Sequence, residues 1–185
     1  YKYLIDQGYK DHRVYSNYGI ILQSFNKLQE AEIYTRKAIQ LKPNFALAYS
    51  NLGNILREVD KLKEAELATR KAIKIKPIYP EASFNLGLIL RDLGKLKEAE
   101  FSLRKAIELK PDFPNAHLNL GNILRDLGKL KEAEFFTRKA IEIQPNIANA
   151  HCNLGNILKD LGQSQDALNS YLKVIEINKS EINIY

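Results

Sequence analysis

The sequence repeats itself every 34 residues without slippage. A period of this length indicates a stack of copies of one supersecondary unit, each burying its apolar face against its neighbours. It predicts five full repeats, at 12–45, 46–79, 80–113, 114–147 and 148–181. The residues that carry the period are Pro43, Pro77, Pro111 and Pro145, then Gly19, Gly53, Gly87, Gly121 and Gly155, and then Ala31, Ala65, Ala99, Ala133 and Ala167.

Each repeat has the pattern of two helices joined by a short turn. In the second repeat, apolar residues at helical spacing predict a first helix over 46–59 and a second over 61–75. Pro80 and Pro114 suit the first turn of a helix, where a missing N–H costs nothing. Glycine inside a helix costs about 0.5–1 kcal/mol relative to alanine. Glycine at one register in all five repeats therefore predicts a close approach of two helices, with Ala65 and its equivalents opposite the glycines.

A Leu-Gly pair, an alanine twelve residues later and a proline twelve residues after that resemble the tetratricopeptide repeat. Leu52-Gly53, Ala65 and Pro77 show this pattern. The resemblance implies an all-α, right-handed α-solenoid (superhelix) of helix-turn-helix hairpins whose first helices line a concave surface. The chain departs from the family where a large aromatic is expected four residues before the glycine and a tyrosine three residues after it. Those positions hold Ser83, His117 and His151, and Leu22, Leu56, Leu90, Leu124 and Leu158.

Both ends of the chain depart from the regular repeat. Residues 1–11 are expected to be the end of an upstream irregular repeat or a cap, and residues 182–185 the start of a further repeat or a C-terminal helix. The sequence contains no methionine, so we expect a longer native array. Apolar residues near both ends predict end-to-end self-association: Tyr1, Tyr3, Leu4, Ile5, Ile182, Ile184 and Tyr185.

Composition restricts the classes of partner and location. A net charge of +6 permits an acidic partner without requiring one. Cys152 is the one cysteine, which excludes an intrachain disulfide and favours a reducing, cytoplasmic location. No apolar run is long enough for a transmembrane helix, so no membrane partner is expected.

No set of residues converges on a catalytic or metal site. His117 and His151 hold the same register in adjacent repeats, and packed helices about 8–10 Å apart would keep them from sharing a metal. Cys152 follows His151 directly and points about 100° away from it on a helix. We therefore expect no catalytic residue, no metal and no cofactor in this segment, and leave the full-length protein open.

The second helices carry charges at a constant register. Glutamate and arginine four residues apart should form stabilising pairs: Glu32/Arg36, Glu66/Arg70, Glu100/Arg104 and Glu134/Arg138. A basic stripe for nucleic acid is the alternative interpretation. We disfavour it, because single-strand binders interleave exposed aromatic residues with the basic ones, and we expect no such exposed aromatics on these helices.

The first helices carry the candidate binding residues. A primary amide can pair with a peptide N–H and C=O together. Asparagine is a mediocre helix former, so its recurrence suggests a use. The candidates for binding an extended peptide are Asn17, Asn51, Asn85, Asn119 and Asn153, then Asn54, Asn122 and Asn156, and then Arg57, Arg91, Arg125 and Lys159, which would favour acidic ligand positions.

The stretch AHLNLGNILRDLGKLKEAE resembles the repeats of O-linked N-acetylglucosamine transferase, in which an asparagine ladder holds the substrate backbone. The resemblance implies a peptide-binding scaffold and no transferase activity, because this chain holds no catalytic domain. Four alternatives stay open. The asparagines could form internal scaffold bonds, and the arginines could form inter-repeat ion pairs, such as Arg57 with Asp92. The array could also be the substrate-recruiting arm of a larger glycosyl- or sulfotransferase, or a self-associating structural solenoid.

Overall fold

The chain is all-α. The computed structural model describes the backbone of residues 1–182 and the side chains of residues 1–179. Eleven helices succeed one another in this range, and no strand occurs in it. Within the described residues, none of these helices combines the length and the apolar character that crossing a membrane requires.

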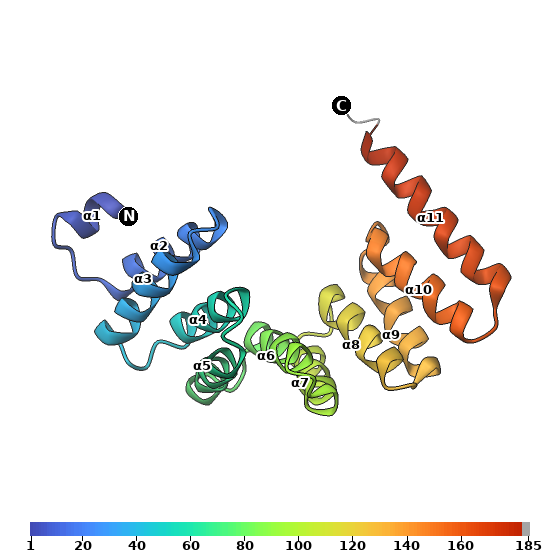
Figure 1. The fold of residues 1–185 in the computed structure, drawn as a ribbon, viewed down its shortest axis with the longest axis horizontal. Helices are drawn as coiled ribbons and strands as arrows, with labels where there is room; N and C mark the ends of the chain where they lie inside the picture. Colours follow the sequence, from blue (N-terminus) through green and yellow to red (C-terminus); the bar gives the residue numbers. More distant parts are fainter. Residues whose placement is uncertain (183–185) are drawn as a thin grey trace. The chain divides into compact units, whose positions relative to one another are not determined.

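The helices fall into two compact halves, Tyr1–Lys95 and Leu96–Tyr185. The N-terminal half holds α1 (Lys2–Asp6), α2 (His12–Ser24), α3 (Leu28–Leu41), α4 (Ala46–Glu58), α5 (Leu62–Ile75) and α6 (Pro80–Asp92). The C-terminal half holds α7 (Leu96–Leu109), α8 (Pro114–Asp126), α9 (Leu130–Ile143), α10 (Ala148–Asp160) and α11 (Ser164–Ile182). In Figure 1 the helices of each half form side-by-side pairs along the chain.

The turn inside each hairpin is set by one residue in the left-handed conformation. Asp60 has a φ of 60°. Its neighbour Lys61 donates its backbone N–H to the carbonyl of Leu56 at 2.8 Å, which closes a Schellman motif. Helix α4 therefore ends at Glu58, one residue before the predicted end, and α5 begins at Leu62. Asn26, Gly94, Gly128 and Gly162 hold the same place, all with positive φ.

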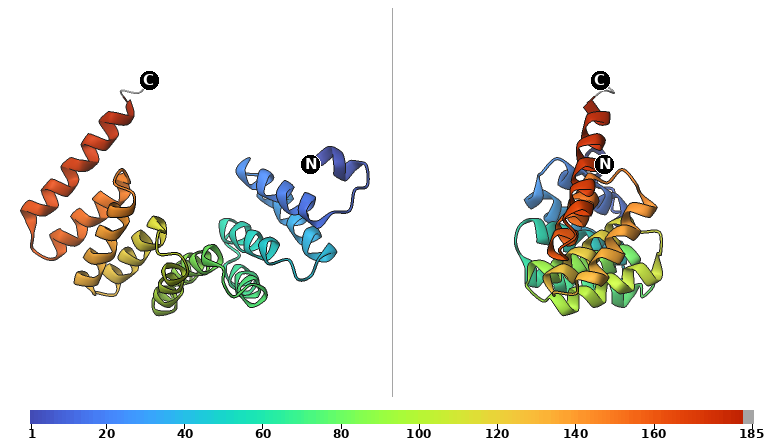
Figure 2. Two further views of the ribbon diagram at one scale, coloured as in Figure 1. Left: turned by 180° about the vertical axis from the view of Figure 1, so that it is seen from behind. Right: turned by 90° about the vertical axis from the view of Figure 1, so that its right-hand side faces the viewer.

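Packing continues from one repeat to the next. Within the halves, α2 pairs with α3, α4 with α5, α8 with α9, and α10 with α11, as the left view of Figure 2 also shows. Helix α4 also packs against α3, and α6 against α5. Ile89 of α6 is fully buried in a cluster with Leu52, Leu56 and Ala65 of the preceding repeat. The buried core therefore lies between neighbouring hairpins as well as within each one.

The helix-interior glycines mark close contacts, as predicted, but the nearest neighbour is a threonine at three of them and the ring of Tyr171 at Gly155. A Cβ placed on Gly121 would collide with the hydroxyl of Thr137 and lie 3.2 Å from the carbonyl oxygen of Ala133. Gly19 and Gly53 meet Thr35 and Thr69 in the same way. The expected alanine thus contributes its backbone oxygen, while the threonine side chain makes the closest approach.

The two ends differ from the regular hairpins. Helix α1 is followed by Gly8, whose φ of 79° lets the chain reverse before α2. Helix α11 has 19 residues where the second helices of repeats 1–4 have 14. It continues through Lys179, which replaces the periodic proline. Of the predicted segment 182–185, Ile182 ends α11, and residues 183–185 lie outside the described residues.

Candidate functional site

The five asparagines two residues before the periodic glycines, here called the amide row, are partly tied into the scaffold. Asn51 is only 8% exposed, and its amide nitrogen donates to the hydroxyl of Ser16 at 3.2 Å. Asn85 donates to Ser50 at 3.4 Å. Both bonds join residues 35 positions apart, and both serines are buried. In these two repeats the amide therefore links one first helix to the preceding one.

The other members of the amide row have different surroundings. The amide nitrogen of Asn17 donates to the Tyr1 hydroxyl at 3.3 Å. That of Asn119 donates to the backbone carbonyl of Asn115 at 2.8 Å, within α8. The residue 35 positions before Asn153 is Leu118, whose side chain offers no acceptor. Asn153 is half-buried, and no side-chain hydrogen bond to it is found among the described residues.

The asparagines one residue after the glycine are half-buried on the same helices. The amide oxygen of Asn156 accepts a hydrogen bond from the Tyr171 hydroxyl at 2.9 Å. Asn54 and Asn122 make no side-chain hydrogen bond to any part of the chain that the structure describes. Their amides are therefore open to an external hydrogen-bonding partner.

Most of the predicted basic selectivity residues are held in ion pairs. Arg57 pairs with Asp92, and the Nε of Arg125 lies 2.6 Å from Asp160. The hydrogen bond to Asp160 raises the pKa of Arg125. Arg91 contacts Asp92 at 3.0 Å. The Arg57 and Arg125 contacts match the inter-repeat salt bridges considered as the alternative to acidic-ligand selectivity, whereas the Arg91 contact lies within α6.

Lys159 differs from the three arginines. Its side chain is exposed on α10, and no ion pair to it is found in residues 1–179. It follows Asn153 and Asn156 at intervals of three residues, so the three side chains share one stripe of the helix. In the C-terminal half, α8 and α10 thus carry three predicted site residues whose side chains pair with no described residue: Asn122, Asn153 and Lys159.

On the second helices the predicted Glu–Arg pairs form and reach the next repeat. Glu32 accepts from Arg36 at 2.8 Å and from Lys61 of the next repeat at 3.0 Å. Burial of Glu32 opposes its ionisation, but the hydrogen bonds from Lys61 and Arg36 outweigh it, so the pKa of Glu32 is lowered. The pKa values of Glu66 and Glu100 are lowered for the same reasons.

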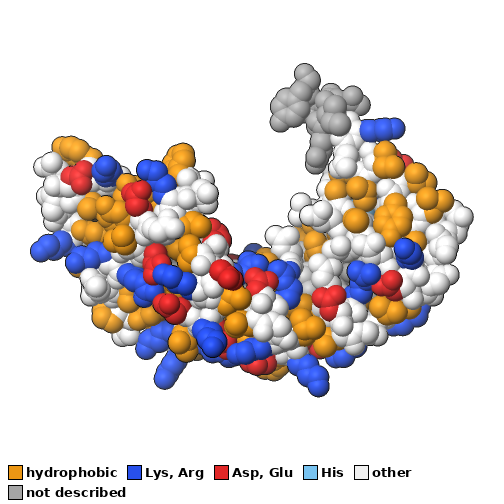
Figure 3. Space-filling view, viewed as in Figure 1, with side chains coloured by type: hydrophobic (Ala, Val, Ile, Leu, Met, Phe, Trp, Pro, Cys, Tyr) orange, Lys and Arg blue, Asp and Glu red, His pale blue; other side chains and the backbone are white. Residues whose placement is uncertain are grey.

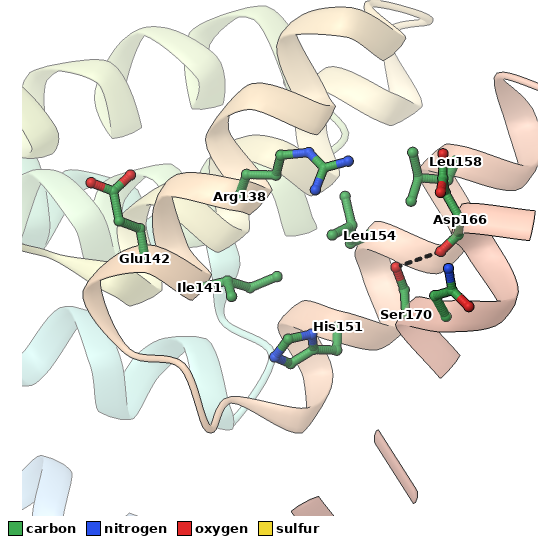
Figure 4. Close-up of a pocket in the computed structure, with 9 residues that line it drawn as sticks. Arg138, Ile141, Glu142, His151, Leu154, Leu158, Asp166 and Ser170 are labelled. Atoms are coloured by element: carbon green, nitrogen blue, oxygen red, sulfur yellow. Dashed lines mark hydrogen bonds between the residues drawn. The ribbon is translucent and has the colours of Figure 1, made fainter. Parts of the chain in front are cut away.

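This ionic network is interrupted between repeats 4 and 5. Gln163 stands where Lys61, Lys95 and Lys129 stand in the preceding repeats, so Glu134 receives no cation from the next repeat there. Asn169 and Ser170 replace the bulky Phe135 and Phe136 of repeat 4. A cavity of about 510 Å³ opens beside them, lined by Arg138, Ile141, Glu142, His151, Leu154, Leu158, Asp166, Asn169 and Ser170. Figure 4 shows Arg138 on α9 and Asp166 on α11 at its rim.

The histidines have structural contacts. His117 is 7% exposed, stacks on Phe136 and bonds through Nε2 to the carbonyl of Pro111 at 2.8 Å. His151 makes the same bond to Pro145. No group of three or more histidine, cysteine, aspartate or glutamate side chains suited to a metal occurs among the described residues. His117 thus replaces the packing aromatic of this register, while His151 makes the same carbonyl bond beside the cavity.

One prediction about the outer surface is wrong. The basic second helices do carry exposed aromatic residues, because Phe101 is 74% and Phe135 56% exposed on α7 and α9. The argument that dismissed a nucleic-acid surface by their absence therefore does not apply. The sequence signal was available, since both phenylalanines lie on the polar side of the helical pattern, one residue after the periodic glutamate.

Comparison with known proteins agrees with this architecture. A "TPR repeat" family model matches residues 87–128, and two "Tetratricopeptide repeat" models match residues 114–147 and 148–181, and residues 12–45 and 46–79. No curated protein sequence matches the chain significantly.

Many solved structures share the fold. YrrB, described as a TPR protein with an unusual peptide-binding site, is 28% identical with a TM-score of 0.74 over 98% of this chain and 93% of its own. A MamA crystal structure is 20% identical with a TM-score of 0.81, over 89% of this chain and 96% of its own. Pseudomonas aeruginosa pilF is 20% identical with a TM-score of 0.83, over 89% and 75%. The family models and the shared fold show that the chain belongs to the tetratricopeptide-repeat family.

Proposed function

We propose that the chain is a non-catalytic scaffold that binds an extended peptide along its first helices. The observation that carries the proposal is the pair of half-buried amides on α8 and α10 that the scaffold leaves unused: Asn122 and Asn153. A half-buried amide with no protein partner is satisfied at low cost by a ligand that offers both a donor and an acceptor. A peptide backbone is such a ligand.

The likeness to YrrB supports this class of function, because that protein is described as having a peptide-binding site and is 28% identical over most of both chains. In our proposal the amide row divides into two roles. Asn51 and Asn85 hold neighbouring first helices together through Ser16 and Ser50. Asn153, with Asn122, contacts the ligand backbone.

Charge selectivity would come mainly from Lys159. The carboxylates of Asp92 and Asp160 already occupy Arg57 and Arg125, so these arginines have less to offer an acidic ligand. Lys159 lies at the end of the α10 stripe and is exposed. We expect an acidic ligand residue to be preferred at this end.

A random twelve-residue peptide library displayed on phage tests the proposal. Enriched sequences should bind the chain in fluorescence polarisation. Asn122→Ala and Asn153→Ala should each weaken that binding by about 0.5–1.5 kcal/mol. Lys159→Gln should reduce the preference for acidic residues. The proposal would be contradicted if no peptide sequence is enriched more strongly on this chain than on an unrelated helical protein.

The matched control is Asn51→Ala, which removes an amide of the same type from a buried position. It should lower the melting temperature because Ser16 loses its partner, whereas Asn153→Ala should leave stability unchanged or slightly higher. If both variants melt alike and bind alike, the division of roles is wrong. A transferase-recruiting role resembling that of O-linked N-acetylglucosamine transferase, and a cytoplasmic location, remain predictions from the sequence.

A further inference from the structure

Helix α11 has an apolar stripe where the other second helices are charged. Repeats 1–4 place glutamate and arginine at two positions four residues apart on this surface, and repeat 5 places Leu168 and Leu172 there. Leu168 is 49% exposed, Leu172 48% and Ile175 50%. Their spacing puts all three side chains on one side of the helix. This α11 stripe lies in the region where Figure 3 shows hydrophobic side chains gathered along α11.

The same positions make contact with the next hairpin in repeats 1–3. Arg36 reaches Glu64 of the following repeat at 2.9 Å, while Glu32 accepts from Lys61. Arg104 pairs in the same way with Glu132, and Glu100 with Lys129. The α11 stripe is therefore a contact surface by position, but its chemistry suits an apolar partner instead of a charged one.

A second copy stacked head to tail does not fit this surface. The residues of repeat 1 equivalent to Lys61 and Glu64 are Lys27 and Glu30, which are 59% and 51% exposed. Stacking repeat 1 on α11 would place this lysine and glutamate over Leu168 and Leu172. Lys27 and Glu30 pair with each other at 3.6 Å, and burying such a pair against leucine costs more in lost hydration than the attraction between the two charges returns. The stripe is, in contrast, complementary to itself.

We propose that the α11 stripe is the surface through which two copies of this chain pair, with the two α11 helices antiparallel about a two-fold axis. Such an isologous contact uses the same patch on both copies. Leu168 lies about one helical turn before Leu172, and Ile175 about one turn after it. With the axis near Leu172, Leu168 of one copy therefore lies against Ile175 of the other. Asn169 then lies opposite the partner's Glu176, where its amide N–H can donate to the carboxylate.

The pairing is weak and does not depend on peptide binding. Three half-exposed side chains on each copy fall well short of the roughly 800 Å² per partner of a stable interface. The dimer should therefore form in a concentration-dependent manner, with fast exchange. Peptide binding by α8 and α10 uses different residues, so either activity can fail without the other.

Sedimentation equilibrium between about 5 and about 500 µM tests the proposal, because weak interfaces of this size assemble in that range. The apparent mass should rise from that of one chain towards that of two. The variant Leu168→Glu with Leu172→Arg restores the pair found in repeats 1–4. It should remain monomeric throughout, with an unchanged circular dichroism spectrum. Leu67→Glu, at a side chain that is 70% exposed on α5, is the control and should dimerise like the parent.

Cross-linking locates the axis. In a Cys152→Ser background, Leu172→Cys should form a disulfide-linked dimer on mild oxidation, and Leu67→Cys should not. A monomeric parent at the highest concentration overturns the proposal, and so does a Leu168→Glu, Leu172→Arg variant that still dimerises. Loss of dimerisation in the Leu67→Glu control would also overturn it, because the contact would then lie elsewhere.

Discussion

Replacing Gly121 with alanine tests the close contact between α8 and α9 directly. Alanine is the better helix former by about 0.8–1.0 kcal/mol, so in an isolated helix the change would stabilise. Here the new Cβ would collide with the buried hydroxyl of Thr137 and lie 3.2 Å from the Ala133 carbonyl and 3.4 Å from the Thr137 amide nitrogen. Overpacking of a core costs about 1–3 kcal/mol. The collision with a fully buried side chain places this case in the upper half of that range.

The net expectation is a loss of about 1–2 kcal/mol, obtained by setting about 2–3 kcal/mol of overpacking against the gain in helix propensity. For a chain of this size that corresponds to a decrease of about 2–8 °C in melting temperature. Urea unfolding followed by circular dichroism measures it. Repeat arrays can lose two-state behaviour, so the m-value must match that of the parent before free energies are compared.

The sign of the effect depends on Thr137. Its hydroxyl is buried with no hydrogen-bond partner, so Thr137→Ala removes the collision without breaking a bond. In that background Gly121→Ala should become neutral or stabilising, giving a coupling of about 2 kcal/mol in the double-mutant cycle. Additive effects of the two substitutions, or a stabilising Gly121→Ala in the parent, would refute this account. Gly128→Ala is the control, because a Cβ added there would meet nothing within 4 Å. Its φ of +74° still makes alanine unfavourable, so this substitution should lower the stability by the same amount with or without Thr137.

Three further predictions concern the turns and the ionic network. Asn26→Gly and Asp60→Gly should each stabilise the chain by about 0.5–1 kcal/mol in urea unfolding, because these residues hold φ of 57° and 60° where glycine has no steric penalty. Gln163→Lys should add the missing cation beside Glu134 and stabilise by about 0.2–0.5 kcal/mol, and the gain should disappear in high salt. The pKa of Glu100 is lowered from 4.5, as burial opposes ionisation but bonds from Lys129 and Arg104 outweigh it. The ionised Glu100 therefore stabilises the folded chain above pH 4.5, and this stabilisation is lost as the pH falls through the lowered pKa of the folded state. On acidification the parent should lose more stability than the Glu100→Gln variant.

Much of the local structure could be predicted from the sequence. The 34-residue period predicts the hairpins, and the apolar spacing predicts α4 and α5 to within a residue of their observed bounds. The Glu–Arg pairs four residues apart also form as expected, because that spacing alone places two side chains together on a helix. These features depend on the geometry of a single helix or turn, which the residues within one repeat determine.

Contacts between helices required the tertiary structure. Periodicity shows that something lies close to Gly121, but only the packing of α8 on α9 shows that Thr137 makes the closest approach. Likewise, the sequence left open whether the asparagines bind a ligand or the scaffold and whether Arg57 pairs with Asp92. Only the structure shows that Asn51 donates to Ser16 and that this ion pair forms. These bonds join residues 35 positions apart, so they depend on how far one hairpin is rotated against the next. That rotation is set by the combined packing of many side chains, and no single motif in the sequence records it.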